Sequence, residues 1–227
     1  MLKAVIFDID GTLVDSVDIH AMAWHEALRE FGYQADYHAV RAQVGKGADK
    51  LIPEFVPQEQ LKAVQQKLAD FRGDLFKRKY LSRIRPLSCV PELMQRVQDE
   101  GLRIALASSA KKDELAAYVK IAGIERFVEQ DTSKDDVDES KPAPDISQAA
   151  LSKLKDVRAP EAIVIGDTPY DAIAARRAGM RCIGVLTGGW TRQELMDTGC
   201  SVVYRSVAEL FAMFDSSPVS KSKRQAA

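Results

Sequence analysis

Cysteine is scarce in this sequence, and its placement gives no sign of a disulfide framework or a zinc site. Three cysteines, Cys89, Cys182 and Cys200, are spread over 227 residues, with no CxxC pair and no Cys/His metal spacing. The pattern is typical of a reducing compartment, where thiols serve as small buried apolar groups. We therefore expect a cytoplasmic protein.

Long apolar runs and a large net charge are also missing. The N-terminal apolar run is about seven residues long and ends at Asp8, which is too short for a signal-peptide core. No other stretch is long enough to span a bilayer. The formal net charge is −1, so no overall field attracts nucleic acid or an anionic membrane surface. We expect a small-molecule partner, with neither nucleic acid nor membrane, and a monomer or homodimer.

Short apolar segments alternate with helical patterns over much of the chain. A nearly continuous apolar run predicts a buried strand at residues 2–9, and similar runs predict strands at 103–109, 126–130, 162–167, 181–188 and 201–206. Helical spacing predicts helices at 91–100, 112–122, 145–154 and 170–178. This alternation is typical of an α/β protein with a doubly wound parallel sheet, which is a Rossmann-like core.

The stretch from Val14 to Arg85 differs, because it contains amphipathic helical patterns and no convincing strand. We predict an α-helical cap domain at residues 15–85, inserted into a core formed by residues 1–14 and 86–216. The polar, basic segment 217–227 lacks apolar periodicity and is predicted to be a disordered tail. Its few charges favour a solvated tail over a nucleic-acid-binding one.

Polar residues follow several of the predicted strands. Asp8 and Asp10 end the first strand, and Ser108 and Ser109 end the second. Asp167 ends the predicted strand at 162–167, and Asp171 follows four residues later. Lys141 comes just before the helix predicted at 145–154. Because ligands bind at the carboxyl ends of strands in parallel α/β sheets, we expect these side chains to converge on one crevice.

Residues two apart on a strand point to the same side, so Asp8 and Asp10 are predicted to face the crevice together. With Asp167 they would form a negative site that needs a cation, and oxygen ligands favour Mg²⁺. Lys141 and the Ser108 hydroxyl would meet substrate oxygens. Gly11 and Thr12 would let backbone N–H groups approach an anion.

Such a site suits phosphoryl transfer, with Asp8 as the nucleophile and Asp10 as the acid and base. Each motif alone has a simpler interpretation. A DxD pair can be a turn or a helix cap, Ser108 a satisfied hydroxyl, and GDTPYD a turn in which Asp167 caps the next helix. Their joint occurrence, in order, at the ends of the predicted elements favours the catalytic interpretation.

The segments FDIDGTLVDS, LASS, ESKPAPD and GDTPYD resemble the four motifs of the haloacid dehalogenase-like hydrolase superfamily. The resemblance covers residues 1 to about 215 and is closest to phosphoglycolate phosphatase-like and beta-phosphoglucomutase-like members with a small helical cap. VLTGGWTRQEL also resembles the phosphatase-like members.

The resemblance implies a role for each motif residue. Asp8 would be the nucleophile and a metal ligand, and Asp10 the acid and base, with its backbone carbonyl on Mg²⁺. Ser108 and Lys141 would hold the phosphoryl group. Asp167 would complete the metal site, and Asp171 would orient the groups around it. Thr12 and Asp15 would shape the flap that leads into the cap.

Two positions depart from the family pattern. Ser140 precedes the motif lysine where the family usually has glycine, and Cys89 stands at the cap exit where glycine is frequent. Neither change removes a catalytic group.

Substrate recognition is expected in the cap. In the segment VGKGADK, Lys46 or Lys50 would contact an anionic part of the substrate, and Ser109 and His20 would face the crevice. His25 and His38 are expected on solvated or packed helix faces. The apolar stripe formed by Trp24, Leu28 and Phe31 is expected to be cap core.

The leading interpretation is Mg²⁺-dependent hydrolysis of a small phosphorylated metabolite, a phosphoglycolate-like or sugar-phosphate-like monoester, through an aspartyl-phosphate. A beta-phosphoglucomutase is the main alternative, although such enzymes usually carry a cap arginine where this chain has Lys46 and Gly47. A phosphonoacetaldehyde hydrolase or a dehalogenase would lack Asp10. A noncatalytic binding protein would be expected to lack Asp8, Lys141 or Asp167, and all three are present.

Overall fold

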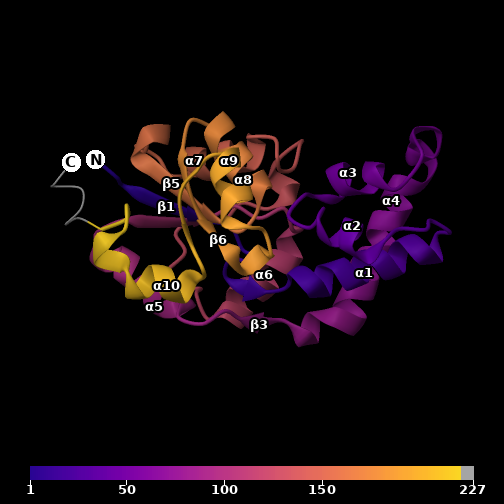
Figure 1. Cartoon of the computed structure of the whole chain (residues 1–227), viewed down its shortest axis with the longest axis horizontal. Coiled ribbons are helices and arrows are strands. Elements are labelled where there is room, and N and C mark those ends of the chain that lie inside the picture. Colours follow the sequence, from indigo (N-terminus) through magenta and orange to yellow (C-terminus); the bar gives the residue numbers. More distant parts are fainter. Residues whose placement is uncertain (221–227) are drawn as a thin grey trace.

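Five parallel strands form the central sheet, in the order β4-β1-β5-β6-β7 (Figure 1). The computed structural model describes residues 1–220. The strands are β1 (Ala4–Phe7), β4 (Arg103–Leu106), β5 (Ala162–Gly166), β6 (Arg181–Val185) and β7 (Cys200–Tyr204). The first strand of the chain lies between β4 and β5, so its carboxyl end has a neighbouring strand on each side.

Both faces of the sheet are covered by helices, as the continuous apolar strands predict. Val5 and Phe7 of β1 belong to one buried cluster, and Ala4 and Ile6 belong to another. The first cluster includes residues of α5 (Val90–Asp99), α6 (Lys112–Ala122) and α10 (Val207–Ala212); the second includes residues of α7 (Asp145–Lys153), α8 (Pro169–Arg177) and α9 (Arg192–Thr198). The predicted doubly wound α/β core is confirmed.

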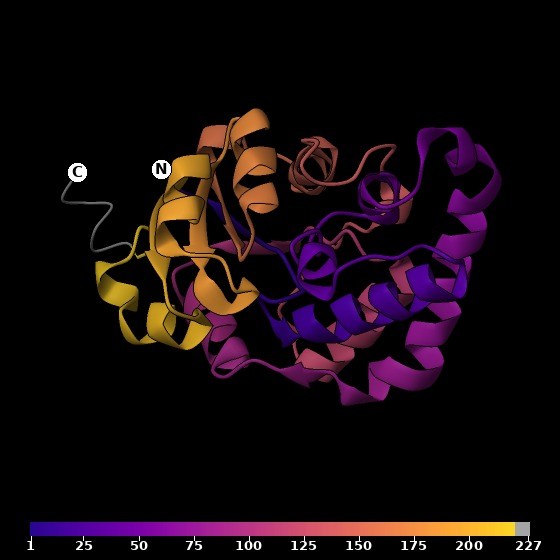
Figure 2. The ribbon, with the colours of Figure 1, turned by 45° about the vertical axis from the view of Figure 1, so that its right-hand side comes forward.

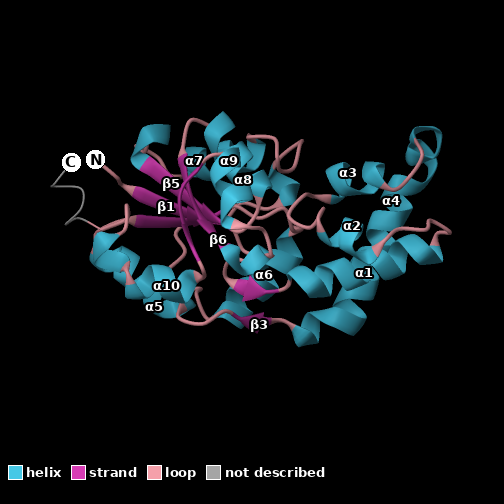
Figure 3. Ribbon diagram, in the orientation of Figure 1, coloured by secondary structure: helices cyan, strands magenta, loops and turns pink. Residues whose placement is uncertain are grey.

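A helical cap is inserted between β1 and β4, also as predicted. It contains α1 (Val17–Glu30), α2 (Tyr37–Arg41), α3 (Ala48–Leu51) and α4 (Gln58–Leu75), and α4 continues into a π-helical turn at Phe76–Tyr80. We call residues 17–83 the cap. Figures 2 and 3 show it as a layer of helices beside the strand-containing core.

Two very short strands join the cap to the core. In this antiparallel pair, β2 (Val14–Asp15) lies opposite β3 (Arg85–Pro86). Both passages between cap and core are therefore held together by backbone hydrogen bonds. Short 3-10 turns complete the chain at Ile52–Glu54, Leu81–Arg83, Lys134–Asp136, Ala159–Glu161, Leu186–Gly188 and Phe214–Ser216.

The strand predicted at residues 126–130 does not form. Only Gln130 makes a bridge, to Ala105 of β4, because the chain is still turning at Phe127, whose N–H donates to the carbonyl of Ile124 at 2.9 Å. Beyond that turn the backbone does run beside β4, and the N–H of Leu106 donates to the carbonyl of Gln130 at 2.9 Å.

The prediction of a disordered tail from residue 217 is wrong for residues 217–220. Residues 217–220 fold onto the core: Val219 is fully buried in the first apolar cluster, and its N–H donates to the Ser217 hydroxyl at 3.2 Å. Burial of Ser217 and Ser220 and the backbone bond from the N–H of Ser217 to the carbonyl of Phe214 at 2.9 Å also hold this segment on the core. Residues 221–227 of the predicted tail lie outside the described residues. Within residues 1–220, no helix has the length and apolar character needed to cross a membrane.

Candidate active site

The chain turns sharply just after β1, and this turn determines where Asp8 and Asp10 lie. The N–H of Asp8 still continues the sheet ladder, donating to the carbonyl of Ile165 at 2.9 Å. Gly11 then takes a φ of +77°, a left-handed conformation that favours glycine. Both carboxylates line one cavity, but they have different partners.

Asp8 is paired with the predicted lysine. The Nζ atom of Lys141 contacts Asp8 Oδ1 directly, lies 2.7 Å from Asp171 Oδ1, and donates to the carbonyl of Ala107 at 2.9 Å. Lys141 is almost fully buried. Burial lowers its pKa, but the charges on Asp171 and Asp8 outweigh burial and raise it, so the lysine remains a cation.

The pKa of Asp8 is raised to about 7. Burial is the main cause, Lys141 opposes it, and the charges on Asp171 and Asp10 add to the increase. Without a further cation, therefore, one lysine does not offset the cost of gathering several carboxylates in a buried site.

Asp8, Asp167 and Asp171 form a buried acidic cluster in which one oxygen from each lies within 4.8 Å of the others. The Thr12 hydroxyl donates to Asp167 Oδ1 at 3.1 Å, whereas Asp167 Oδ2 has no hydrogen-bond partner within residues 1–220. Burial and the charges of Asp8 and Asp171 raise the pKa of Asp167 well above its ordinary value. Buried, crowded carboxylate oxygens with one unsatisfied atom fit a hard divalent cation.

The helix that follows Asp167 is capped by another residue. Thr168 is the N-cap of α8: its side chain accepts from the N–H of Asp171, and the Asp171 carboxylate accepts in return from the N–H of Thr168 at 3.0 Å. The alternative in which Asp167 caps this helix is therefore wrong. One carboxylate oxygen of Asp171 accepts from the N–H of Thr168 at the start of α8, and the other contacts Lys141. Asp171 therefore links this helix end to the acidic cluster.

Asp10 turns toward the cap. Its Oδ1 accepts from the Ser16 hydroxyl at 2.6 Å and lies 2.8 Å from Nε2 of His20. His20 stacks on Phe76, and its other ring nitrogen contacts the guanidinium of Arg72. His20, predicted to face the crevice, lines the same cavity.

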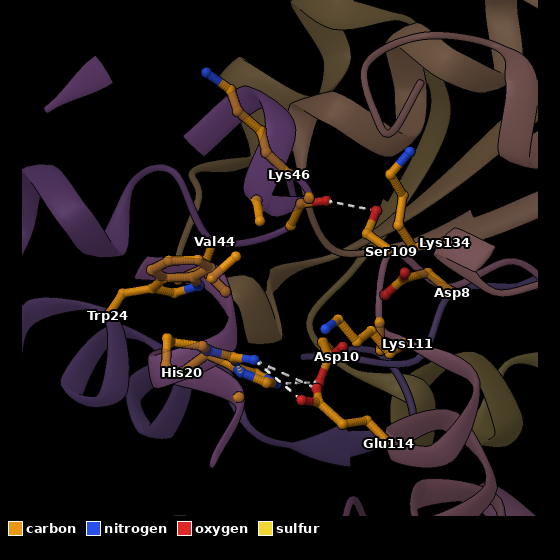
Figure 4. Close-up of a pocket in the computed structure, with 17 residues that line it drawn as sticks. Asp8, Asp10, His20, Trp24, Val44, Lys46, Ser109, Lys111, Glu114 and Lys134 are labelled. Carbon is orange, nitrogen blue, oxygen red and sulfur yellow. Dashed lines mark hydrogen bonds and ion pairs between the residues drawn. The ribbon is translucent and has the colours of Figure 1, made fainter. Parts of the chain in front are cut away.

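The cavity between core and cap has a volume of about 110 Å³ (Figure 4). Asp8 and Asp10 lie on one side of it, and Trp24 and Val44 of the cap lie on the other. Trp24 is therefore both cap core, as predicted, and part of the cavity wall.

Four further predicted site residues differ in whether they line the cavity: Ser108, Ser109, Lys46 and Lys50. Ser109 lines the cavity, and its hydroxyl donates to the carbonyl of Gly45 at 3.2 Å; Ser108 is fully buried and accepts from the N–H of Ala110 at 3.1 Å. Lys46 lines the cavity, but its Nζ lies 2.9 Å from Glu54 Oε1. Lys50 pairs with Glu139 at 2.7 Å and is not among the residues that line this cavity.

Four charged residues of the cavity wall were not predicted from the sequence: Arg72, Lys111, Glu114 and Lys134. Arg72 and Glu114 form a buried ion pair between cap and core at 3.2 Å. No local motif marks Arg72 or Glu114, because the two residues lie on opposite sides of the cavity and meet only when the cap folds over the core. Lys111 lies two residues after the LASS segment, and this closeness to a motif could have marked it as a candidate site residue.

The chain thus combines a parallel α/β core, a cluster of carboxylates with a lysine near the carboxyl ends of its strands, and a helical cap over that cluster. The family model described as "Haloacid dehalogenase-like hydrolase" matches residues 5–185, so the chain belongs to that family.

Named relatives agree with this assignment. A phosphoglycolate phosphatase of Vibrio parahaemolyticus is 31% identical over 205 residues, which cover 85% of this chain and 87% of the relative. A validoxylamine A 7'-phosphate phosphatase of Streptomyces hygroscopicus is 26% identical, with 82% and 87% covered. The crystal structure of a hydrolase from Pseudomonas syringae superposes with a TM-score of 0.84 at 28% identity, covering 94% of this chain and 98% of that one.

Proposed function

We propose that this protein is a Mg²⁺-dependent phosphatase that hydrolyses a small phosphate monoester through an aspartyl-phosphate on Asp8. The observation that carries the proposal is the placement of Asp8 at a cavity of about 110 Å³, in contact with Lys141 and clustered with Asp167 and Asp171. The phosphatase names of the two relatives support the same reaction class.

The chain's own residues suffice to outline two half-reactions. In the first, Asp8 attacks phosphorus, the bond to the leaving oxygen breaks, and Asp10 gives that oxygen a proton. In the second, Asp10 takes a proton from a water molecule that attacks the aspartyl-phosphate, which releases phosphate and restores the Asp8 carboxylate. Lys141 favours the anionic form of Asp8, without outweighing burial by itself, and offsets the charge of the incoming phosphoryl group.

Asp8 and Asp167 would hold the magnesium ion, which would neutralise phosphate charge as an electrophile, and Asp171, whose oxygens contact Thr168 and Lys141, would orient the groups around it. The backbone carbonyl of Asp10 remains a predicted additional ligand. The Asp10 carboxylate is directed to Ser16 and His20 instead, which leaves it for proton transfer.

Hydrolysis is favoured over phosphoryl transfer between two positions of a sugar. A mutase needs a site for a second phosphate, and the cap cations at the cavity, Lys46 and Arg72, are already paired with Glu54 at 2.9 Å and with Glu114 at 3.2 Å. The substrate class that we propose is a compact ester, such as phosphoglycolate or a short sugar phosphate.

The test is phosphate release from phosphoglycolate, sugar phosphates and an aryl phosphate, ranked by kcat/KM with and without Mg²⁺. Asp8→Asn should reduce phosphate release at least about 1,000-fold, because an amide is a poor nucleophile. Asp99→Asn, at an exposed position of α5, is the matched control and should leave the rate unchanged. Equal rates for wild type and Asp8→Asn would contradict the nucleophile. Formation of glucose 6-phosphate from beta-glucose 1-phosphate, in place of free phosphate, would show a mutase.

A further inference from the structure

The residue before the active-site lysine joins the core to the cap. Ser140 is fully buried, and its hydroxyl donates to Asp49 Oδ1 at 2.6 Å and accepts from the N–H of Gly47 at 3.0 Å. Its backbone N–H lies 3.2 Å from Asp49 Oδ2. These hydrogen bonds connect residues that are about ninety positions apart in the sequence and belong to the core on one side and the cap on the other.

The backbone of Gly47 lies so close to the Ser140 side chain that only glycine fits without a shift. A Cβ atom on Gly47 would lie 2.6 Å from the Cβ and Oγ atoms of Ser140. Gly45, with a φ of +105°, faces the core in the same way, because a Cβ there would lie 2.9 Å from Thr168. The two glycines let the loop around Lys46 lie directly on the core, and Figure 4 shows the neighbouring contact from Ser109 to this loop.

Ser140 is adjacent to Lys141, whose Nζ contacts Asp8 and lies 2.7 Å from Asp171. The same short loop therefore contacts the cap through one residue and the nucleophile through the next. A glycine at position 140 would retain only the backbone bond to Asp49, so both bonds of the hydroxyl depend on this serine.

We propose that Ser140 and Asp49 are positioning residues that couple docking of the cap loop at residues 45–49 to placement of Lys141 against Asp8. This role rests on the proposed phosphatase function of the same site. The Asp49 carboxylate accepts two hydrogen bonds from Ser140, and bonds to an ionised acceptor are stronger than neutral ones.

An exposed ion pair lies next to this contact and provides a control. Lys50 Nζ and Glu139 Oε2 are 2.7 Å apart, with side chains 36% and 58% exposed. Exposed pairs of this kind contribute little to the free energy of unfolding. Glu139→Gln breaks a cap-to-core contact beside Ser140 without touching the buried hydrogen bonds.

The kinetic test compares Ser140→Ala, Asp49→Asn, the double variant and Glu139→Gln. Each single variant at the contact should lower kcat about tenfold, as expected for loss of a charge-assisted hydrogen bond, while KM changes less than about threefold. The double variant should be no slower than the slower single one, because both changes remove the same contact. Glu139→Gln should stay within about threefold of wild type. Additive losses, or kcat values equal to wild type, would overturn the proposal.

Hydrogen exchange of the Gly47 amide tests the contact without any substrate. Its acceptor is the Ser140 hydroxyl, so Ser140→Ala should speed exchange of this amide at least about tenfold and Glu139→Gln should not. If wild type releases no phosphate from any ester, the proposed function fails while the exchange result still reports docking of the loop. If wild type is active but Ser140→Ala changes neither Gly47 exchange nor kcat, the positioning role alone is wrong.

Discussion

Nε2 of His20 lies 2.8 Å from Oδ1 of Asp10, so the first helix of the cap holds the carboxylate proposed to transfer protons. The same oxygen accepts from Ser16 at 2.6 Å. Burial raises the pKa of Asp10, but the charge of His20 and the hydrogen bonds from His20 and Ser16 outweigh burial and lower it below its ordinary value. The cap thus affects the proton chemistry of a core residue.

His20→Ala should reduce kcat about 10- to 100-fold, which is less than the roughly 100- to 10,000-fold contribution of a general acid or base, because Asp10 itself remains. Removing the charge and hydrogen bond of His20 raises the pKa of Asp10, so the carboxylate stays protonated to higher pH. The acidic limb of the kcat profile should therefore move to higher pH. His25→Ala is the control, because His25 lies on the same helix against the Tyr37 ring. An acidic limb that does not move in His20→Ala would contradict the coupling.

Metal binding should change how stability depends on pH. Burial above all raises the pKa of Asp8 from 3.8 to about 7, and the pKa of Asp167 is raised as well. Without metal, the folded protein binds these protons more tightly than the unfolded chain does. The resulting stability is complete below about pH 4 and is lost as the pH rises through about 7.

We expect Mg²⁺ to raise Tm by several degrees more at about pH 8 than at about pH 5, because a cation replaces the missing protons at the higher pH. Thermal unfolding in chelator and in excess Mg²⁺ at both pH values measures the difference. Asp167→Asn should reduce the gain at the higher pH, since it removes one carboxylate of the cluster. Equal gains at both pH values would speak against a carboxylate metal site.

The ion pair between Arg72 and Glu114 should stabilise the closed arrangement of cap and core. Its side chains are only 10% and 4% exposed, and the guanidinium also lies over the ring of Trp24, 5.1 Å from its centroid. Arg72→Met leaves Glu114 buried without its partner, which should cost about 3–5 kcal/mol and lower Tm by about 10 °C.

Lys77 and Asp113 provide the matched control, because they form an exposed ion pair between the same regions of cap and core, with side chains 42% and 58% exposed. Lys77→Met should cost less than about 1 kcal/mol. Denaturant unfolding of the two variants gives the comparison, and similar losses for both would refute a special role for the buried pair.

Replacing Cys89 by glycine, the residue that is frequent at this position in the family, should stabilise the protein. Its φ is +63°, a left-handed conformation that costs a residue with a Cβ atom about 1–2 kcal/mol relative to glycine. Cys89→Gly should raise the free energy of unfolding by about 1 kcal/mol, after the greater chain entropy of glycine is subtracted. Cys89→Ala removes the thiol and keeps the strain, so a gain in Cys89→Ala as large as in Cys89→Gly would trace the effect to the thiol.

Local sequence patterns were sufficient for most of the fold. The apolar run before Asp8, the alternation of strands and helices and the amphipathic stretches of the cap correspond to β1, the parallel sheet and the helices α1 and α4. These patterns are informative because a strand covered on both faces must be apolar throughout and a packed helix must be apolar at a regular spacing. The segment 126–130 was mispredicted because an apolar residue, Phe127, is buried from a turn as readily as from a strand.

The sequence by itself determined which chemistry the core can carry, since Asp8 and Asp167 follow strands whose carboxyl ends are brought together by the parallel topology, and Lys141 lies in the loop before α7. Only the tertiary structure decided what faces them. Arg72 meets Glu114, and Asp49 meets Ser140, across the space between cap and core. Such pairs depend on how two separately patterned surfaces pack, and no periodicity within either segment encodes the residue that will lie opposite.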